Sequence, residues 1–181
     1  AVLKVAETIF DSMRRVHGMG PRERLLLQIA VLIHACGKFI SMKNSNECGY
    51  TLIMSTEIIG LSHLEREIIA NVVRYNIRDF DYDMMQLETE AGQDLAGVSD
   101  RTAITILIAK LTAILRLANS MDKTHKSKLI DCRMAVREGQ LVITTGYKGD
   151  LALESASFEQ KAAFFEEIFG IRPVLKQKRR V

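Results

Sequence analysis

The chain has 181 residues, 48% of them hydrophobic, which is enough to bury the core of one domain or of a domain with a small subdomain. Its formal net charge is only +3, so the composition gives no overall signal for a polyanionic partner, although local basic patches remain open. Cys36, Cys48 and Cys132 form no CxxC pair and no even set, which excludes a disulfide framework and indicates a reducing, cytoplasmic compartment.

The first residues carry charged side chains among the apolar ones and show no signal-peptide pattern. Because a helical pattern begins at Ala1 with no starting Met and no cap, we expect a fragment of a longer protein. Residues 1–16 predict an amphipathic helix. Its inward stripe comprises Val2, Val5, Ala6, Ile9, Phe10, Met13 and Val16.

Residues 25–40 are apolar nearly all round, which predicts a helix buried on most of its faces. Pro21 suits the first turn of this helix, since its missing N–H would be unbonded there in any case. Gln28, His34 and Lys38 interrupt the apolar run, so we expect no membrane span. An imidazole near the end of a buried helix needs a hydrogen-bond partner or a ligand.

The middle of the chain predicts further helices. Residues 41–48 are expected to form a polar loop and residues 49–59 a helix. A capping box at Ser62 and Glu65 opens a helix through about residue 76. We expect the acidic residues 78–97 to form a loop with a short helix. Ser99 or Asp100 then caps a mostly buried helix to about residue 119.

The pattern changes after Asp122. A polar connector, 123–128, leads to two strands, 130–136 and 141–147, with a hairpin turn between them. A second capping box at Ser157 predicts the start of a helix that Gly170 ends, and residues 171–175 predict a last strand. The fold class is therefore mainly α, a helical domain over 1–126 followed by a small α+β subdomain over 127–181.

Two segments resemble the motifs of HD-type phosphohydrolases, in which a His-Asp pair holds a divalent metal that activates water. Residues 32–38 resemble the run L-x-H-D-x-G-K, with His34 present and Ala35 in the Asp position. Residues 115–122 resemble R-x-A-D-x-x-D, with Asn119 in the first Asp position and Asp122 retained. Since alanine cannot bind a metal and an amide is a poor substitute for carboxylate, we predict an HD-like helical bundle without a bound metal.

An ordered series of segments sharpens this resemblance to one family. It comprises residues 24–30, 32–38, 49–53, 69–76, 115–122 and 165–175. The series is similar to the C-terminal region of the exopolyphosphatase/guanosine pentaphosphate phosphatases (Ppx/GppA). The resemblance implies that the hydrolytic site and its Mg²⁺ belong to an N-terminal actin-like region outside this chain. It also implies a C-terminal domain that helps to bind polyphosphate and forms a homodimer.

The resemblance implies a degenerate HD pocket of His34, Asn76, Asn119 and Asp122, where Asn76 stands in a position at which the family often has His. His34 is either a metal ligand, with Cys36 and Cys48 as further soft ligands, or a core histidine bonded to Asn76 or Asn119. For Asp122, the simplest expectation is a helix-end carboxylate paired with Lys123 or Arg116. No nucleophile elbow or glycine-rich phosphate loop is present, so no catalytic residue is predicted.

Several cations lie near the helix ends and the connector, where they could line a groove for a phosphate chain. The predicted phosphate-binding residues are Arg74, Arg78, Arg116, Lys123, Lys126 and Lys128. The alternative is a solvated surface. The basic run 176–180 is expected to be a solubilising tail.

Three function classes remain open. The first is an accessory domain of a hydrolase acting on polyphosphate or guanosine pentaphosphate. The second is a free-standing HD phosphohydrolase, and the third is an interaction module without a phosphate role. Nucleic acid is a weaker candidate, because only 6% of residues are aromatic and no stacking platform is visible.

Overall fold

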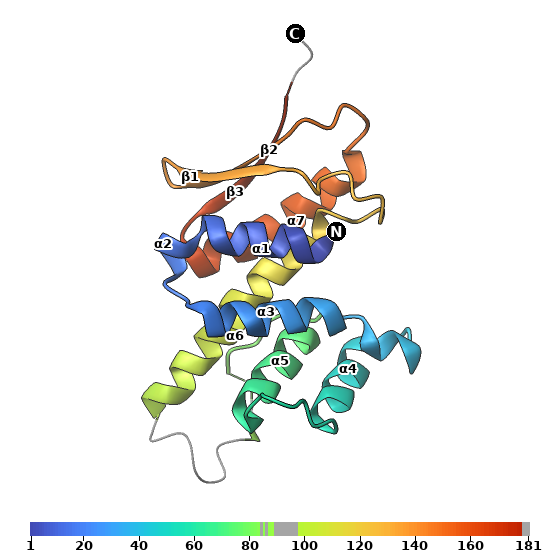
Figure 1. Ribbon diagram of the computed structural model, residues 1–181, viewed down its shortest axis with the longest axis vertical. Helices are drawn as coiled ribbons and strands as arrows, with labels where there is room; N and C mark the ends of the chain where they lie inside the picture. Colours follow the sequence, from blue (N-terminus) through green and yellow to red (C-terminus); the bar gives the residue numbers. More distant parts are fainter. Residues whose placement is uncertain (84, 86, 89–97, 179–181) are drawn as a thin grey trace. The chain divides into compact units, whose positions relative to one another are not determined.

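The structure is a computed structural model that describes residues 1–83, 85, 87, 88 and 98–178 (Figure 1). It is mainly helical with a three-stranded sheet, as the sequence predicts. The helices are α1 Val2–Ser12, α2 Arg14–His17, α3 Pro21–Ile33, the 3-10 helix η1 Cys36–Phe39, α4 Ser45–Met54, α5 His63–Tyr75, α6 Val98–Ser120 and α7 Ala152–Phe169. The strands are β1 Arg133–Arg137, β2 Gln140–Thr145 and β3 Arg172–Gln177.

The chain divides into two compact units. Unit 1 comprises Ala1–Gln28 and Ala113–Val181, and unit 2 comprises Ile29–Thr112. Helices α3 and α6 therefore contribute one part to each unit. The domain boundary expected after residue 126 lies inside unit 1, and whether 127–181 forms a subdomain of its own stays a prediction.

The sheet of unit 1 has the strand order β1-β2-β3. The β1–β2 pair is antiparallel and the β2–β3 pair is parallel, with α7 as the connection between β2 and β3. Helix α1 packs against β1 and α7 against β3, and Figure 1 shows both helices on one side of the sheet. Leu141 and Ile143 on this inner side are fully buried, as are Phe158 and Phe165 of α7.

The expected hairpin turn is confirmed. Glu138 and Gly139 connect β1 to β2, and both have a positive φ, 49° and 73°. A two-residue turn with positive φ at both positions matches the right-handed twist of the flanking strands. Strand β1 itself begins at Arg133, three residues later than the apolar alternation predicts.

The capping box predicted at Ser157 is wrong. Helix α7 begins at Ala152, so Ser157 lies in its second turn. The Asp150 carboxylate accepts a hydrogen bond from the Ala152 N–H at 2.8 Å, which starts the helix earlier than the serine pattern indicates. Gly170 ends α7 in the left-handed conformation, φ 66°, as predicted.

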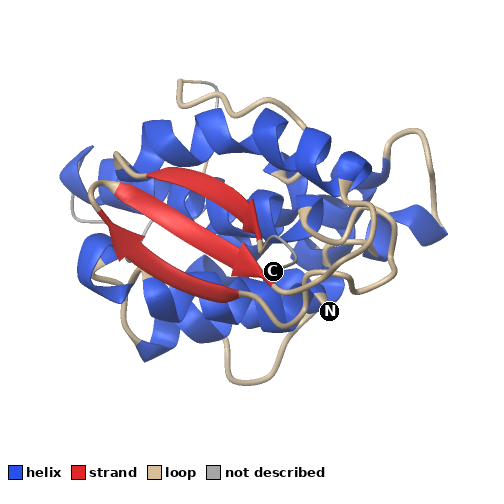
Figure 2. Ribbon diagram, turned by 90° about the horizontal axis from the view of Figure 1, so that it is seen from above, coloured by secondary structure: helices blue, strands red, loops and turns tan. Residues whose placement is uncertain are grey.

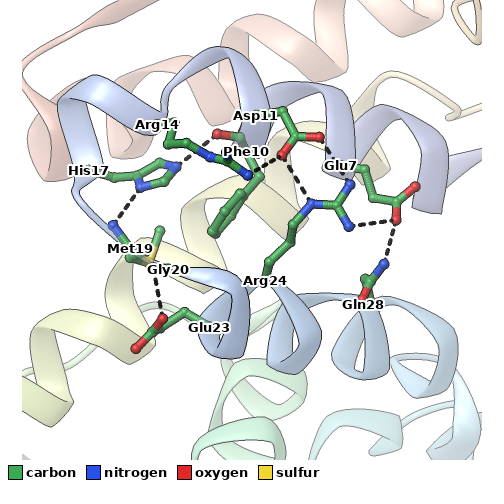
Figure 3. Close-up of polar contacts among 10 residues, drawn as sticks. All are labelled: Glu7, Phe10, Asp11, Arg14, His17, Met19, Gly20, Glu23, Arg24 and Gln28. Atoms are coloured by element: carbon green, nitrogen blue, oxygen red, sulfur yellow. Dashed lines mark hydrogen bonds and ion pairs between the residues drawn. The ribbon is translucent and has the colours of Figure 1, made fainter.

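A polar network joins α1 to α3 within unit 1 (Figure 3). Arg24 of α3 donates to both carboxylate oxygens of Asp11 at 3.0 Å and to Glu7 at 3.2 Å. Gln28, one turn further along α3, also donates to Glu7, at 2.5 Å. The bidentate geometry positions the planar guanidinium against α1 and sets the register between the two helices.

His17 at the end of α2 is a buried histidine that the sequence does not single out. Its Nε2–H donates to the carbonyl oxygen of Phe10 at 2.8 Å, and its Nδ1 accepts from the Met19 N–H at 2.9 Å (Figure 3). The ring therefore has a neutral form protonated at Nε2. It closes the turn into α3, whereas the expected continuous helix over 1–16 is broken at Met13 and leaves Val16 exposed.

The long buried helix predicted over 25–40 is wrong in its second half. Helix α3 ends at Ile33, the chain then forms η1, and Leu32 and Phe39 are 68% and 94% exposed. The cause is a close approach of two backbones. A Cβ on Gly37 would lie 1.8 Å from the Ser45 carbonyl oxygen and 2.5 Å from the Gly49 nitrogen, so η1 packs directly on α4.

Helix α4 begins at Ser45, so residues 45–48 are helical rather than loop, and it ends at Met54 instead of residue 59. It packs against α5, which begins with the predicted capping box. The Ser62 N–H donates to the Glu65 carboxylate at 2.8 Å, and the Glu65 N–H donates to the Ser62 hydroxyl at 3.1 Å. The buried apolar residues of α5 include Ile68, Ile69, Val72 and Val73.

Helix α6 ends at Ser120, close to the expected end, and its described start at Val98 precedes the expected caps. Its stretch Arg101–Ser120 is long and apolar enough to cross a membrane by length and composition alone. However, 61% of its most apolar window is buried inside the structure, as in the core helix of a globular domain. Most of the acidic segment 78–97, with its expected short helix, lies outside the described residues.

Candidate phosphate-binding cluster

Two of the predicted phosphate-binding arginines converge on one carboxylate in unit 2. Arg74 Nε and Nη2 donate to Glu47 Oε2 at 3.2 and 3.0 Å, and Arg78 Nη1 donates to Glu47 Oε1 at 3.1 Å. Arg74 lies in the last turn of α5 and Arg78 lies three residues beyond the end of that helix at Tyr75, and both side chains reach Glu47. The shared carboxylate places the two guanidinium groups next to each other.

Tyr50 of α4 positions one of these arginines. It follows Glu47 by three residues on the same helix, and the Arg74 guanidinium carbon lies 3.4 Å from its ring centroid. Burial raises the pKa of the Tyr50 hydroxyl, and the nearby Glu88 carboxylate acts in the same direction. The ring therefore remains neutral and presents its face to the cation.

In this cluster two guanidinium groups share the Glu47 carboxylate, and the Glu88 carboxylate lies within reach of the Tyr50 hydroxyl. The Arg74 side chain is 21% exposed and the Arg78 side chain is 54% exposed. Arg74 is thus restricted by a ring and a carboxylate, while Arg78 reaches solvent. Guanidinium groups bond the oxygens of carboxylates and of phosphates in the same planar geometry.

The four other predicted cations belong to unit 1. Arg116 is buried, and its guanidinium carbon lies 4.5 Å from the Phe164 ring centroid. Lys128 is likewise engaged within the fold, since its Nζ donates to Glu154 at 3.1 Å and to the Asp150 carbonyl oxygen at 2.9 Å. Lys123 and Lys126 are exposed on the connector.

Glu154 is a buried acid that explains the position of Lys128. Burial alone would raise its pKa, but hydrogen bonds from Thr124 and Lys128 prevail, and the pKa is lowered. Lys128 is thus the counter-ion of a buried carboxylate, which contributes to the fold of unit 1 rather than to an open surface.

Two residues of the expected HD pocket, His34 and Asn76, share no hydrogen bond. His34 is half-buried rather than buried, and its Nδ1–H donates to the Val31 carbonyl oxygen at 2.6 Å, so it satisfies the end of α3. Asn76 is buried, and its Oδ1 has no hydrogen-bond partner among the described residues. The predicted bond between the two side chains is therefore not formed.

Asp122 also differs from expectation. Its Oδ1 accepts from the backbone N–H of Ser127 at 2.8 Å, rather than pairing with Lys123 or Arg116. This bond stabilises the connector, in which His125 and Ser127 both have a positive φ. His34 and Asn76 belong to unit 2, while Asn119 and Asp122 belong to unit 1. Their grouping into one pocket stays a prediction.

The comparison with protein families decides the affiliation. A family model described as Ppx/GppA phosphatase, domain III, matches residues 1–162. The chain belongs to the Ppx/GppA phosphatase family. A comparison with curated proteins found no match. The matched range contains every segment of the ordered series except the last, so the predicted resemblance is confirmed, and the chain is an accessory domain of a family of phosphatases.

The residues of this Ppx/GppA domain III do not fit an HD-type metal. Across the described residues, no three His, Cys, Asp or Glu side chains come together as a possible ligand set. Ala35 removes the carboxylate next to His34, and the Nδ1 of His34 is turned to a backbone carbonyl. A divalent ion needs several oxygen or nitrogen donors around it. These residues therefore offer an HD-type metal the imidazole of His34 without the neighbouring carboxylate.

Sequence reasoning missed Glu47 and Tyr50, the two residues that organise the cluster. The sequence predicts residue 47 in a loop, where its position relative to Tyr50 carries no meaning. Once α4 begins at Ser45, the two side chains lie three residues apart on one helical face. Asn44, which precedes this helix, is an N-cap type of residue and is the signal that could have placed the start correctly.

Proposed function

We propose that this domain binds the phosphate chain of the substrate of its parent Ppx/GppA phosphatase, polyphosphate or guanosine pentaphosphate, and does not itself hydrolyse it. The observation that carries the proposal is the pair of guanidinium groups, Arg74 and Arg78, held side by side on Glu47. Planar guanidinium groups bind phosphate oxygens in a bidentate manner and at short distance. A linear phosphate chain offers such oxygens at every unit.

Binding would proceed by exchange. Arg74 remains on the Tyr50 ring, while Arg78 leaves Glu47 and bonds a phosphate oxygen. The Glu47 carboxylate limits the affinity for phosphate, since both arginines already bond it. A small monoanion competes with this carboxylate less well than a multiply charged chain does. Lys123 and Lys126, both exposed on the connector in unit 1, are proposed as phosphate contacts of that unit by itself. The parent's Mg²⁺ and its hydrolytic site are proposed to belong to other parts of that protein.

We also propose that the domain forms a homodimer through unit 2. Phe39 and Met42 are 94% and 77% exposed, and Leu32 and Ile40 nearby in sequence are exposed as well. A contiguous exposed patch of such apolar side chains is unfavourable in water, and patches of this kind commonly form protein–protein interfaces. Sedimentation of the wild type against Phe39→Ser/Met42→Ser tests this. A monomeric wild type would contradict it.

The phosphate proposal is tested by titrating the chain with tripolyphosphate and guanosine pentaphosphate at several salt concentrations. The variant is Arg74→Gln/Arg78→Gln, and the matched control is Arg14→Gln/Arg15→Gln, which removes two exposed positive charges from α2. We expect the first variant to lose about two units of the double-logarithmic salt slope and the control to lose none. The single variant Arg78→Gln changes a half-exposed side chain and should not disturb folding, so a loss of binding in this variant would not result from misfolding. Equal slopes in all proteins would refute the assignment.

A further inference from the structure

Strand β3 lies at an edge of the sheet in unit 1. The order β1-β2-β3 gives it one neighbour, β2, and no other strand of the described chain pairs with it. Helices α1 and α7 lie on one side of the sheet, and Figure 2 looks onto the other side, where the strands lie side by side with no described helix in front of them. The outward edge of β3 and this outer face are therefore surfaces that a partner could reach.

The hydrogen bonds to β2 define which backbone groups of β3 point away from the sheet. The Arg172 N–H donates to the Gly139 carbonyl oxygen at 3.3 Å, and the Lys178 N–H donates to that of Thr145 at 3.0 Å. Even-numbered residues of β3 therefore direct their N–H and C=O toward β2, and odd-numbered residues direct theirs outward. The outward groups are the C=O of Pro173 and both backbone groups of Leu175 and Gln177.

These outward groups have no hydrogen-bond partner among the described residues, although Leu175 is only half-buried and Gln177 is exposed. Natural sheets often protect such an edge with proline, and Pro173 does so at the start of β3, where it removes an outward N–H. Arg172 adds ion pairs with two glutamates of α7 at the same end. The later part of the edge, at Leu175 and Gln177, has neither protection.

The charges beside this later part are positive. Alternation places Lys176 on the outer face, in register with Thr144 of β2 and, through it, with Arg133 of β1. Lys178 continues the same side just beyond β3. Arg133, Lys176 and Lys178 are exposed, and within the described part of the chain none of these side chains forms an ion pair or a hydrogen bond. No carboxylate occupies an outer-face position that the two registers define.

The other side of the edge is apolar and already ordered. Leu175 is half-buried on the side of the sheet that faces α7. The Gln177 side chain donates to the carbonyl oxygens of Tyr147 and Gly149 at 2.8 and 3.0 Å, which fixes the end of β3 against the loop that follows β2. A partner therefore meets a preformed strand with cations on its outer side and an apolar residue on its inner side.

We propose that the edge of β3 binds an acidic, extended segment of a protein partner, which adds a fourth strand to the sheet. Such a strand supplies an N–H and a C=O for the outward backbone groups. Acidic residues at alternate positions of the segment lie opposite Lys176 and Lys178, where the side chains of paired residues are about 5 Å apart. The residues between them are apolar and contact Leu175.

The backbone of the edge distinguishes a polypeptide from a polyanion such as a phosphate chain. A phosphate chain offers acceptors, which suit lysine and the outward N–H groups, but it has no donor for the carbonyl oxygens of Pro173, Leu175 and Gln177. A polypeptide carries donors and acceptors with the repeat of a strand. The proposed surface is therefore distinct from the phosphate binding proposed for Arg74 and Arg78.

The test is a titration of the whole chain with a synthetic peptide of about eight residues, in which Glu alternates with Val or Thr. The variant Lys176→Gln/Lys178→Gln is compared with the matched control Arg14→Gln/Arg15→Gln. We expect the variant to bind the peptide about tenfold more weakly and the control to bind it as the wild type does. A peptide that is N-methylated at its donors to the edge keeps the charge, and it should bind the wild type about tenfold more weakly.

Three results would overturn the proposal. The first is no binding of the alternating peptide to the wild type. The second is equal affinity for the N-methylated peptide, or for a peptide with its glutamates in one block, because only charge would then be recognised. The third is an equal loss in the variant and the control. Circular dichroism and thermal unfolding check that Lys176→Gln/Lys178→Gln is folded.

A further variant separates this surface from the proposed phosphate site. Arg74→Gln/Arg78→Gln should bind the alternating peptide with the affinity of the wild type, because that cluster belongs to unit 2 and β3 to unit 1. If this variant alone lost the peptide, the peptide would belong to the arginine cluster and the assignment to β3 would be wrong. If it loses tripolyphosphate and retains the peptide, both proposals stand independently.

Discussion

The guanidinium of Arg74 lies on the ring of Tyr50, its carbon 3.4 Å from the ring centroid. The ring thereby restricts the position of the guanidinium group, which Glu47 also bonds. Tyr50→Leu should lower the free energy of unfolding by about 1–3 kcal/mol, through the lost cation–π contact and the lost aromatic packing. Tyr50→Phe retains the ring and is the control, and it should cost less than half as much in urea unfolding. Equal costs would show that the hydroxyl, not the ring, matters.

Gly37 is expected to tolerate no side chain. A Cβ there would lie 1.8 Å from the Ser45 carbonyl oxygen, which is backbone and cannot move aside cheaply. Gly37→Ala should therefore cost about 3 kcal/mol or more, at the upper end of overpacking effects. Gly146→Ala is a matched control, because a Cβ at that position would meet no other atom within 4 Å. Thermal unfolding of both variants gives the comparison, and similar melting temperatures would contradict the close approach of η1 and α4.

Leu111 and Leu32 differ in burial, so their substitutions by alanine should differ in cost. Leu111 is fully buried, so Leu111→Ala should cost about 2–5 kcal/mol. The apolar pattern of residues 25–40 predicts the same cost for Leu32→Ala, but Leu32 is 68% exposed, and the expected cost for the monomer, without the proposed dimer contact, is therefore less than about 0.5 kcal/mol. Denaturant unfolding of the two variants distinguishes the cases. A large loss for Leu32→Ala would mean that a partner covers this side chain.

The Asp11–Arg24 pair predicts a specific pH dependence. The hydrogen bonds from Arg24 hold the pKa of the Asp11 carboxyl below its usual range. A lowered pKa in the folded state means that the stabilisation is present above the pKa of the unfolded chain and is lost as the pH falls through the folded pKa. Because Asp11 is nearly half exposed, the contribution is under about 1 kcal/mol.

The measurement is the difference in unfolding free energy between the wild type and Asp11→Asn. It should be positive at pH 7 and should vanish in strong acid, where Asp11 is protonated. High salt should reduce it at neutral pH as well, since a partly exposed pair is screened. A difference that does not change with pH would mean that the packing of residue 11, rather than its charge, stabilises the α1–α3 contact.

The isolated domain is expected to release no phosphate from polyphosphate or guanosine pentaphosphate. The described residues contain no metal ligand set, and the arginine cluster carries no nucleophile. Phosphate release with added Mg²⁺ or Mn²⁺ is compared with a blank and with the Arg74→Gln/Arg78→Gln variant. Release that co-purifies with the protein would contradict the accessory assignment and would favour a free-standing phosphohydrolase.

Local sequence patterns were sufficient wherever a few neighbouring residues settle the structure. The Ser62–Glu65 capping box, the Glu138–Gly139 turn and the Gly170 helix end depend on backbone groups within a few positions, and all are present. The same holds for the family, because the order of short motifs along the chain does not depend on packing. Ser157 shows the limit, since the helix already begins at Ala152, where the Asp150 carboxylate accepts a hydrogen bond from the Ala152 N–H, and the serine motif therefore lies inside it.

The sequence by itself determined the mainly helical class, the late sheet and the family. The tertiary structure decided where the apolar run 25–40 stops being helix, because only the approach of Gly37 to Ser45 and Gly49 shows why the chain must turn there. It also decided which partner each cation contacts. Arg116 and Lys128 look the same as Arg78 in sequence, yet one lies on Phe164 and the other neutralises Glu154. Charge is a property of a residue, but its availability depends on the partners that folding brings to it.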